Sequence, residues 1–259
     1  MCMKNLKDKT VFITGASSGI GKACATLFAE EGANLLLAAR RMDRVKKLSE
    51  ELRNQNQINT KEIKLDVRNY DEVTNTLSSL GGEWKQIDIL VNNAGLARGF
   101  SKIHEGKVED WEEMIDTNVK GLLFVTRQVL PQMVERKTGH IINIGSIAGH
   151  ETYPSGNVYA ATKFAVNAIS KSIRMDVLDK GIKVSSIDPG LVETEFSLVR
   201  FSGDEKRAKS VYKGLTPLTA MDIAETVLFC ATRPDNVNIN EMIITPLAQA
   251  STSHYHREA

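Results

Sequence analysis

The chain has 259 residues, of which 42% are hydrophobic and 25% are charged, and its formal net charge is +1. This is an ordinary globular composition, and no Pro/Ser-rich linker divides it, so we expect a single domain over residues 1–259. Because basic and acidic residues are interleaved, we expect no nucleic-acid partner. Because no apolar run approaches the roughly 18 residues that span a bilayer, we expect no membrane partner.

Cysteine and histidine usage predicts neither a disulfide framework nor a metal site. Cys2, Cys24 and Cys230 are far apart and form no CxxC pair. His254 and His256 supply only two ligands, and no HExxH motif is present, so we expect no bound metal. The first residues, "MCMKNLKDK", lack the apolar region of a secretory signal, which favours a cytoplasmic location.

Short apolar runs alternate with amphipathic stretches along the chain. The apolar runs predict strands over 10–14, 34–39, 62–66, 87–91, 140–145, 182–187 and 241–245. Helical spacing covers 19–32, 118–137 and 157–181, with Gly32 and Gly181 as stop signals. Several strands are continuously apolar, as parallel strands buried on both faces are. The pattern predicts an α/β fold: a single Rossmann-like, doubly wound parallel sheet of about seven strands, flanked by helices.

A glycine-rich turn, "TGASSGIG" (14–21), follows the first predicted strand directly. Gly15, Gly19 and Gly21 stand where the strand turns into a helix, and glycine there allows a positive φ and close approach of a phosphate. The helix amino terminus would offer free N–H groups to that anion. The spacing is not the G-x-G-x-x-G of the dinucleotide fingerprint, so a purely structural turn is the alternative.

Two further groups stand at strand ends. Asp66 ends the third predicted strand, and "NNAG" (92–95) follows the fourth. Ligands of open parallel sheets bind outside the carboxyl ends of the strands. We therefore expect both groups to line one crevice with the glycine turn.

Tyr159 and Lys163 lie four residues apart on a predicted helix, and therefore on one helix face. An ammonium beside a phenol favours the phenolate and lowers its pKa, so the tyrosine could exchange a proton with a substrate oxygen. Ser146 follows the fifth strand, where its hydroxyl could bond that oxygen. Tyr-x-x-x-Lys pairs also occur by chance, so the pair taken alone favours a structural role.

Asn118 opens or interrupts a predicted helix, where its amide could satisfy backbone groups or hold a water. The alternative is a simple helix cap. A serine hydrolase lacks support, because no Asp–His relay to Ser146 is evident from the positions of His140 and His150.

Taken in order, "TGASSGIG", "NNAG", Asn118, Ser146, Tyr159-x-x-x-Lys163 and "PG" at 189–190 closely resemble the short-chain dehydrogenase/reductase family. The resemblance covers about residues 10–245. It implies that Tyr159 is the general acid/base, that Ser146 orients the substrate oxygen, and that Asn118 supports a relay water near Lys163. It further implies a hydride transfer between a nicotinamide and a secondary alcohol or ketone.

The same resemblance implies a cofactor site. Lys163 would lower the tyrosine pKa and hold the nicotinamide ribose, while "PGLVET" would cover the nicotinamide, with Thr194 near its carboxamide. The expected cofactor-binding residues are Gly15, Ser17, Ser18, Gly19, Ile20, Gly21, Arg40, Arg41, Asp66, Val67, Asn93, Ala94, Gly95, Tyr159, Lys163, Pro189, Gly190, Val192 and Thr194.

Within that family, "IINIGSIAG", "YPSGNVYAATKFAV" and the stretch from 190 to 212 resemble the NADP-dependent 3-hydroxy acid dehydrogenases. This implies a substrate such as serine, allo-threonine or 3-hydroxypropionate/malonic semialdehyde, and a homotetramer built on the two long helices, with the C-terminal tail also in subunit contacts. A carbonyl or steroid reductase of bulkier apolar substrates is the alternative, because one fold hosts many substrates. A non-catalytic dinucleotide-binding regulator is a second alternative, but the Ser–Tyr–Lys set is complete.

Arg40 and Arg41 end the second predicted strand, roughly 20 residues beyond the glycine turn. An NAD enzyme would carry an acid there for the ribose 2′-OH, whereas a guanidinium pair attracts a 2′-phosphate. The next carboxylate is Asp43, which we expect to cap the following helix. The pair predicts NADP(H), and a solvated strand end is the alternative.

Residues 191–214 are expected to form a substrate lid, and Arg200 within them could bind a substrate carboxylate bidentately. The alternative is a structural or solvated arginine, for example one paired with Glu193 or Glu195. The charged runs 44–53 and 204–209 are predicted to be i,i+4-paired helix surfaces, not partner sites.

Overall fold

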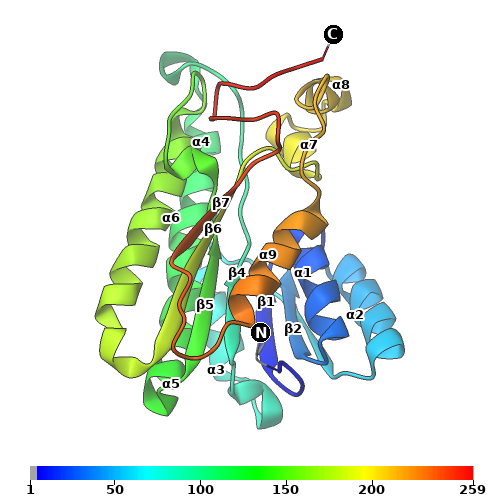
Figure 1. Cartoon of the computed structure of the whole chain (residues 1–259), viewed down its shortest axis with the longest axis vertical. Coiled ribbons are helices and arrows are strands. Elements are labelled where there is room, and N and C mark those ends of the chain that lie inside the picture. Colours follow the sequence, from blue (N-terminus) through cyan, green and yellow to red (C-terminus); the bar gives the residue numbers. More distant parts are fainter. Residues whose placement is uncertain (1–4, 259) are drawn as a thin grey trace.

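The computed structural model describes residues 5–258, and at its centre is one sheet of seven parallel strands (Figure 1). The strands are β1 (Thr10–Thr14), β2 (Asn34–Ala39), β3 (Thr60–Lys64), β4 (Ile89–Asn92), β5 (Gly139–Ile144), β6 (Ile182–Pro189) and β7 (Glu241–Ile244). Their order across the sheet is β3-β2-β1-β4-β5-β6-β7. The chain thus starts in the middle of the sheet, builds one half and then crosses to the other. This confirms the predicted doubly wound α/β fold.

The predicted bounds of β1 and β2 match the structure, but β3 begins and ends two residues earlier than predicted. Its pairing with β2 runs from Leu35 opposite Thr60 to Ala39 opposite Lys64, and it ends where β2 ends. Asp66 therefore lies in the loop beyond the strand, at the edge where the ligand crevice was expected.

Helices cover both faces of the sheet. They are α1 (Gly19–Glu30), α2 (Met42–Asn56), α3 (Tyr70–Ser78), α4 (Val108–Ile115), α5 (Leu122–Arg136), α6 (Asn157–Asp176), α7 (Phe196–Arg200), α8 (Glu205–Ser210) and α9 (Ala220–Ala231). Buried side chains of α1, α2 and α9 pack on one face, and those of α3, α5 and α6 pack on the other. In Figure 1 the first group lies beside β1 and β2, and α5 and α6 lie on the opposite side of the sheet.

The two cores explain why the strands read as continuously apolar. In β1, Val11 and Ile13 belong to the core under α1 and α9, whereas Phe12 belongs to the core under α5. All three side chains are fully buried. Because successive strand residues point to opposite faces, a strand covered on both faces needs an apolar residue at every position.

Both predicted glycine stops have a left-handed backbone. Gly32 follows α1 with a φ of +77°, and Gly181 has a φ of +67° after the short turn that follows α6. A residue with a Cβ rarely adopts this conformation, so glycine ends each helical run and directs the chain into the next strand.

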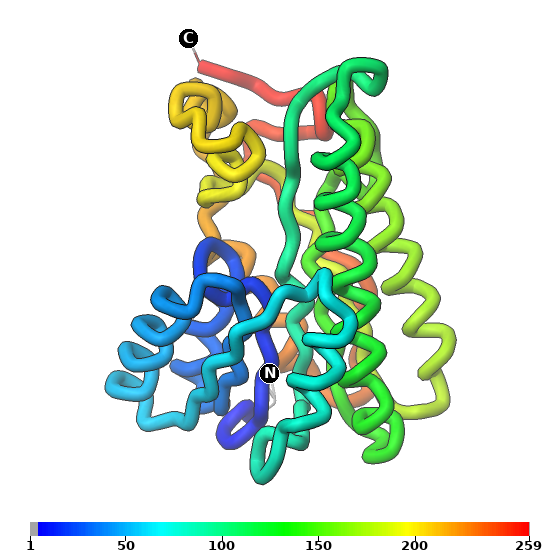
Figure 2. Tube along the Cα trace, turned by 180° about the vertical axis from the view of Figure 1, so that it is seen from behind, coloured from blue at the N-terminus to red at the C-terminus, as the bar shows by residue number. Residues whose placement is uncertain are grey.

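Within residues 5–258, no helix combines the length and the apolar character needed to cross a bilayer. Cys24 and Cys230 are free and buried, and Cys2 lies outside the described residues. Figure 2 shows the C-terminal segment, in red, crossing the end of the molecule that carries α7 and α8, in yellow. Its Glu258 N–H donates to the carbonyl of Gly214, 2.7 Å away.

Candidate active site

A cavity of about 730 Å³ opens at the carboxyl edge of the sheet, a size typical of ligand and cofactor sites. Of the predicted site residues, all but Gly21 and Asn118 line it. The chain therefore brings together residues from the glycine turn, the ends of β2 to β6, helix α6 and the segment 191–200. The single crevice predicted from the strand ends is present.

The glycine turn needs glycine for two reasons, a left-handed backbone at two positions and close packing against Asn93. Gly15 and Gly19 have φ values of +68° and +53°. Gly21 lies under the turn, because a Cβ there would come 2.5 Å from the Nδ2 of Asn93 and from the carbonyl oxygen of Gly15. Gly21 thus shapes the turn without facing the cavity.

Thr14, which the sequence did not single out, ties this turn to the "NNAG" loop. Its Oγ1 accepts hydrogen bonds from the backbone N–H groups of Asn93 and Ala94, each at 3.0 Å. The Nδ2 of Asn93 in turn donates to the carbonyl of Thr14 at 2.9 Å. The hydroxyl at the end of β1 and the amide after β4 therefore fix the floor of the cavity. In the sequence, this role of Thr14 is signalled only by the presence of a hydroxyl residue directly before Gly15.

Ser146, Tyr159 and Lys163 meet at one end of the cavity. Lys163 Nζ donates to the carbonyl of Ile144 at 2.9 Å and lies 5.9 Å from the centre of the Tyr159 ring. Ser146 Oγ accepts the N–H of Ala148 at 3.1 Å, which orients the hydroxyl. Tyr159 also hydrogen-bonds Ser146, and this bond lowers its pKa. The structure thus places the predicted serine, tyrosine and lysine together.

The electrostatics of Tyr159 differ from the sequence prediction. Burial raises the pKa of its phenol above the ordinary value, and this effect outweighs the lowering by Ser146 and Arg200. Arg200, which the sequence did not connect with Tyr159, is a cation that lowers this pKa. Burial also lowers the pKa of Lys163 to about 8, although the nearby Asp188 carboxylate opposes the shift.

Asn118 is not a helix cap. It lies in a π-helical turn, Asp116–Gly121, between α4 and α5, so the regular α-helix is interrupted there, as one of the two predictions had it. Its side chain accepts the N–H of Leu96 and donates to the carbonyl of Leu96, each at 2.8 Å, and also donates to Thr162 Oγ1 at 3.0 Å. The buried amide therefore joins the π turn to the loop after β4 and to α6.

Arg200 contacts aromatic residues in place of the predicted glutamates. Its Nη2 donates to the hydroxyl of Tyr153 at 2.9 Å and its Nε to the carbonyl of Gly99 at 3.2 Å. The guanidinium lies 4.8 Å from the ring centre of Phe100 and 5.7 Å from that of Tyr159. The alternative pairing with Glu193 or Glu195 is therefore wrong, and Arg200 faces the catalytic end of the cavity.

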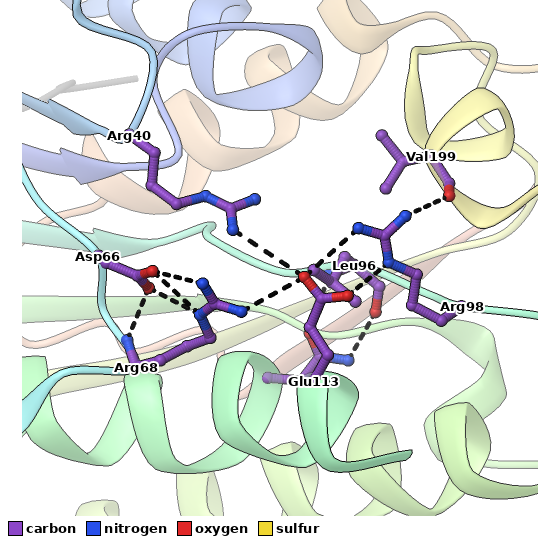
Figure 3. Close-up of polar contacts among 8 residues, drawn as sticks. Arg40, Asp66, Arg68, Leu96, Arg98, Glu113 and Val199 are labelled. Carbon is purple, nitrogen blue, oxygen red and sulfur yellow. Dashed lines mark hydrogen bonds and ion pairs between the residues drawn. The ribbon is translucent and has the colours of Figure 1, made fainter. Parts of the chain in front are cut away.

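At the other end of the cavity, Glu113 of α4 gathers three arginines (Figure 3). Its carboxylate lies 2.6 Å from Arg98, 3.4 Å from Arg68 and 4.0 Å from Arg40. These arginines hold the pKa of Glu113 below its ordinary value, Arg98 most strongly. Arg98 also donates to the carbonyl of Val199 at 2.9 Å. One partly buried carboxylate thus links the side of the cavity that holds Arg40 to the segment 191–200.

Asp66 belongs to the same group of charges. Arg68 binds both of its carboxylate oxygens, with Nη2 2.6 Å from Oδ2 and Nε 2.9 Å from Oδ1 (Figure 3). This bond holds the pKa of Asp66 below its ordinary value. Asp66 is therefore ionised at neutral pH and held in one orientation at the cavity wall.

Arg41 binds the glycine turn and the segment 191–200 together. Its guanidinium donates to the hydroxyls of Ser17 and Ser18 and to the carboxylate of Glu195. Asp43 lies in the first turn of α2, and Arg41 is the residue before that helix, so the predicted cap is wrong. The acidic residue still favours the helix amino terminus.

His150 forms the Asp–His pair that the sequence did not reveal. Its Nε2 lies 2.7 Å from Asp188 Oδ2 and 3.5 Å from Glu241 Oε1. Among the hydrogen bonds of residues 5–258, none joins His150 to Ser146. The imidazole therefore serves the carboxylates beside β6, and the arrangement does not form a nucleophilic triad.

Three comparisons relate this chain to known proteins. A family profile described as "short chain dehydrogenase" matches residues 9–204. The chain is 43% identical over 257 residues, covering 99% of both chains, to the NADP-dependent 3-hydroxy acid dehydrogenase of Schizosaccharomyces pombe. It is 46% identical over 250 residues to the NADP-dependent 3-hydroxy acid dehydrogenase YdfG of Escherichia coli K12, covering 96% of this chain and 99% of that protein. The closed form of serine dehydrogenase complexed with NADP+ has a TM-score of 0.90 to this structure at 45% identity, over 96% of this chain and 100% of that chain.

Proposed function

The chain belongs to the short-chain dehydrogenase family, and on that premise we propose that it is an NADP(H)-dependent oxidoreductase that interconverts the alcohol and carbonyl forms of a small 3-hydroxy acid. The observation that carries the proposal is the cavity itself. It holds the Ser146–Tyr159–Lys163 cluster and Arg200 at one end, and the glycine turn with Arg40 and Arg41 at the other. The reaction therefore has a proton donor, an anion site and a cationic cofactor site within one space.

In this proposal the cofactor lies along the glycine turn. The left-handed Gly15 and Gly19 present bare backbone to the cavity, and α1 begins at Gly19, so free N–H groups face the same space. Arg40 and Arg41 supply positive charge for a 2′-phosphate, and Asp66 and Val67 line the wall beside them. The residues present thus fit NADP(H), which when bound supplies or accepts the hydride.

Tyr159 moves the proton. Because burial keeps the pKa of the phenol high, Tyr159 is protonated at neutral pH and can donate its proton to a carbonyl oxygen in the reductive direction. Ser146 holds that oxygen with its oriented hydroxyl. Lys163, whose pKa of about 8 lies near neutrality, can return a proton toward the phenol. Asn118 shapes this end of the site through its bonds to Leu96 and Thr162.

A 3-hydroxy acid is favoured over a bulky neutral substrate by Arg200. Its guanidinium lies beside both Tyr153 and Tyr159, so a carboxylate bound to it would place the neighbouring carbonyl carbons near the phenol. Phe196 packs edge-on against Tyr159, with ring centres 5.6 Å apart, and limits the space there. Serine, allo-threonine and 3-hydroxypropionate/malonic semialdehyde combine a carboxylate with an oxygen at the third carbon. A carbonyl or steroid reductase would need no such cation.

We further infer a cytoplasmic homotetramer. Leu123 on α5 and Phe164 and Met175 on α6 are 41%, 42% and 77% exposed. Large apolar side chains exposed on two adjacent helices favour contact with other subunits. Light scattering after size-exclusion chromatography should give four times the chain mass, and a monomer mass would contradict this assembly.

The function is tested by a substrate panel with both cofactors. We expect NADPH-dependent reduction of malonic semialdehyde and NADP+-dependent oxidation of serine, allo-threonine and 3-hydroxypropionate, with much weaker turnover of steroids and bulky ketones. The Tyr159→Phe variant should still bind NADPH, measured by its fluorescence, but lose turnover. Equal turnover of wild type and variant would contradict the proposal, and so would a preference for bulky neutral ketones. If wild type binds NADPH but turns over none of these substrates, the alternative of a non-catalytic dinucleotide-binding regulator would be favoured.

A further inference from the structure

Glu195 bridges two arginines at the cavity end that holds the glycine turn. Its Oε2 lies 2.9 Å from Arg41 Nη1, and its Oε1 lies 2.6 Å from Arg44 Nη1. Both arginines lie at the start of α2, whereas Glu195 is the residue directly before α7. The contact therefore spans the cavity, between residues about 150 positions apart in the chain.

The guanidinium of Arg41 has no edge free for bidentate binding of another anion, because both edges include donors that are already engaged. Its Nε and Nη2 donate to Ser17 Oγ at 3.3 and 3.2 Å, its Nη2 also donates to Ser18 Oγ at 2.8 Å, and its Nη1 donates to Glu195. An anion that binds Arg41 in a bidentate manner must therefore replace a present partner. The serine hydroxyls are neutral, but Glu195 carries the charge that an anionic ligand would repel.

Glu195 is suited to release. Its side chain is 40% exposed, and it makes no capping bond to α7. The two arginines, Arg44 first, hold the pKa of its carboxyl below the ordinary value, so the group is an anion at neutral pH. Exchange of this carboxylate for another anion leaves both arginines paired, and Glu195 returns to solvent.

We propose that Glu195 occupies the 2′-phosphate subsite as an internal anion, that the 2′-phosphate of the cofactor displaces it, and that Arg44 joins Arg41 as a ligand of that phosphate. The inference rests on the proposed NADP(H) function and deepens it. A cofactor without the 2′-phosphate leaves Glu195 in place, whereas NADP(H) frees the start of the segment 191–200. The same carboxylate thus sets the affinity difference between the two cofactors and ties the segment to α2 until the phosphate arrives.

The test uses two nucleotides that differ only in this phosphate, adenosine 2′,5′-bisphosphate and adenosine 5′-phosphate. Titration calorimetry measures the affinity of each for the full chain and for two variants. Glu195→Gln removes the internal anion. Glu193→Gln is the matched control, since it makes the same charge change two residues away on an exposed side chain that is not paired with Arg41 or Arg44 among the described residues.

We expect the Glu195→Gln variant to bind the bisphosphate about fivefold more tightly than wild type, because the phosphate no longer has to break the two exposed ion pairs of Glu195. Its affinity for adenosine 5′-phosphate should be unchanged. Glu193→Gln should change neither affinity. Arg44→Met should weaken bisphosphate binding and leave adenosine 5′-phosphate binding unchanged. Unchanged or weaker bisphosphate binding by Glu195→Gln would overturn the proposal. If wild type itself binds the two nucleotides equally, the NADP(H) assignment fails, whatever the variants do.

Tryptic cleavage within α8 gives a second readout. Lys206 and Lys209 on this helix are exposed, and the segment from Glu195 leads directly into it. Saturation of wild type with the bisphosphate should change the cleavage rate there relative to adenosine 5′-phosphate, because only the bisphosphate releases Glu195. In Glu195→Gln the two nucleotides should give equal rates. A persistent difference in that variant would contradict the coupling.

Discussion

The guanidinium of Arg200 lies 5.7 Å from the centre of the Tyr159 ring and lowers the pKa of its phenol. Lys163, the neighbour on the same helix, lies at 5.9 Å but points its Nζ at the carbonyl of Ile144. A residue of the segment 191–200, and not only of the catalytic helix, therefore helps to set when the tyrosine gives up its proton.

Arg200→Met should shift the pH profile of alcohol oxidation to higher pH. Oxidation needs the phenolate of Tyr159, so kcat/KM rises as pH rises through the phenol pKa of the free enzyme. Arg200 lowers the phenol pKa of Tyr159, so its removal should raise that pKa further. The pH range over which kcat/KM increases should therefore move to higher pH. The profile should be measured with a neutral secondary alcohol, so that carboxylate binding does not contribute. Arg207→Met, which removes a cation stacked on Phe201, is the control and should not shift the profile. An unchanged profile in Arg200→Met would remove the electrostatic role.

Arg200→Met should also discriminate between acid and neutral substrates. If the guanidinium binds the substrate carboxylate, its loss should lower kcat/KM for a 3-hydroxy acid by about 10- to 100-fold, as expected for a charged hydrogen-bonded pair. For a neutral alcohol of similar size, the loss should be only the part that comes from the shift of the phenol pKa, which affects both substrates equally. Steady-state kinetics with 3-hydroxypropionate and 2-propanol would measure both. An equal loss for the two substrates would eliminate the carboxylate role.

Arg40→Asp should shift the cofactor preference toward NAD(H), because an acid at the end of β2 repels a 2′-phosphate and accepts ribose hydroxyls. The ratio of kcat/KM for NADPH to that for NADH should fall by about tenfold or more, and Arg41→Ala should lower it as well. Arg53→Asp is the control, since Arg53 lies in the last turn of α2, does not line the cavity and pairs with Glu62. Unchanged preference in both Arg40→Asp and Arg41→Ala would refute the assignment.

Much of the fold and the meeting of the site residues could be predicted from the sequence, because parallel strands impose a strong pattern. A strand buried on both faces is apolar at every position, as Val11, Phe12 and Ile13 are, and the carboxyl ends of such strands share one edge. Gly15, Ser146 and Pro189 had to fall at that edge once the strands were placed. A period of four residues was enough to put Tyr159 and Lys163 on one helix face.

The ionic contacts could not be predicted in the same way. Local pairing is visible in the sequence, and the predicted i,i+4 surfaces contain Lys47–Glu51 and Lys209–Glu205. Arg44 stands in the same charged run, yet its partner is Glu195, 151 positions away. A charged residue on a helix looks the same in sequence whether it meets solvent or a distant carboxylate, because its partner depends on tertiary packing.

Gly145→Ala should destabilise the fold, and with it the position of Ser146. A Cβ at Gly145 would overlap Oδ1 of Asp188. That carboxylate is fully buried and is held by Ser186 at 2.6 Å and by His150 at 2.7 Å, so it cannot move aside without the loss of both bonds. Overpacking of this kind costs about 1–3 kcal/mol, which for a chain of this length lowers the melting temperature by several degrees.

The matched control for this substitution is Gly81→Ala. Nothing lies within 4 Å of a Cβ at Gly81, and its φ of −126° suits any residue. Calorimetric unfolding of the two variants should therefore separate them, with Gly81→Ala at the wild-type melting temperature and Gly145→Ala clearly below it. Activity at a temperature where both are folded should also fall in Gly145→Ala alone, since Ser146 is the next residue. If Gly145→Ala has the same melting temperature as wild type, the carboxylate of Asp188 can move aside at little cost. The tight packing behind Ser146 would then not hold the catalytic hydroxyl in place.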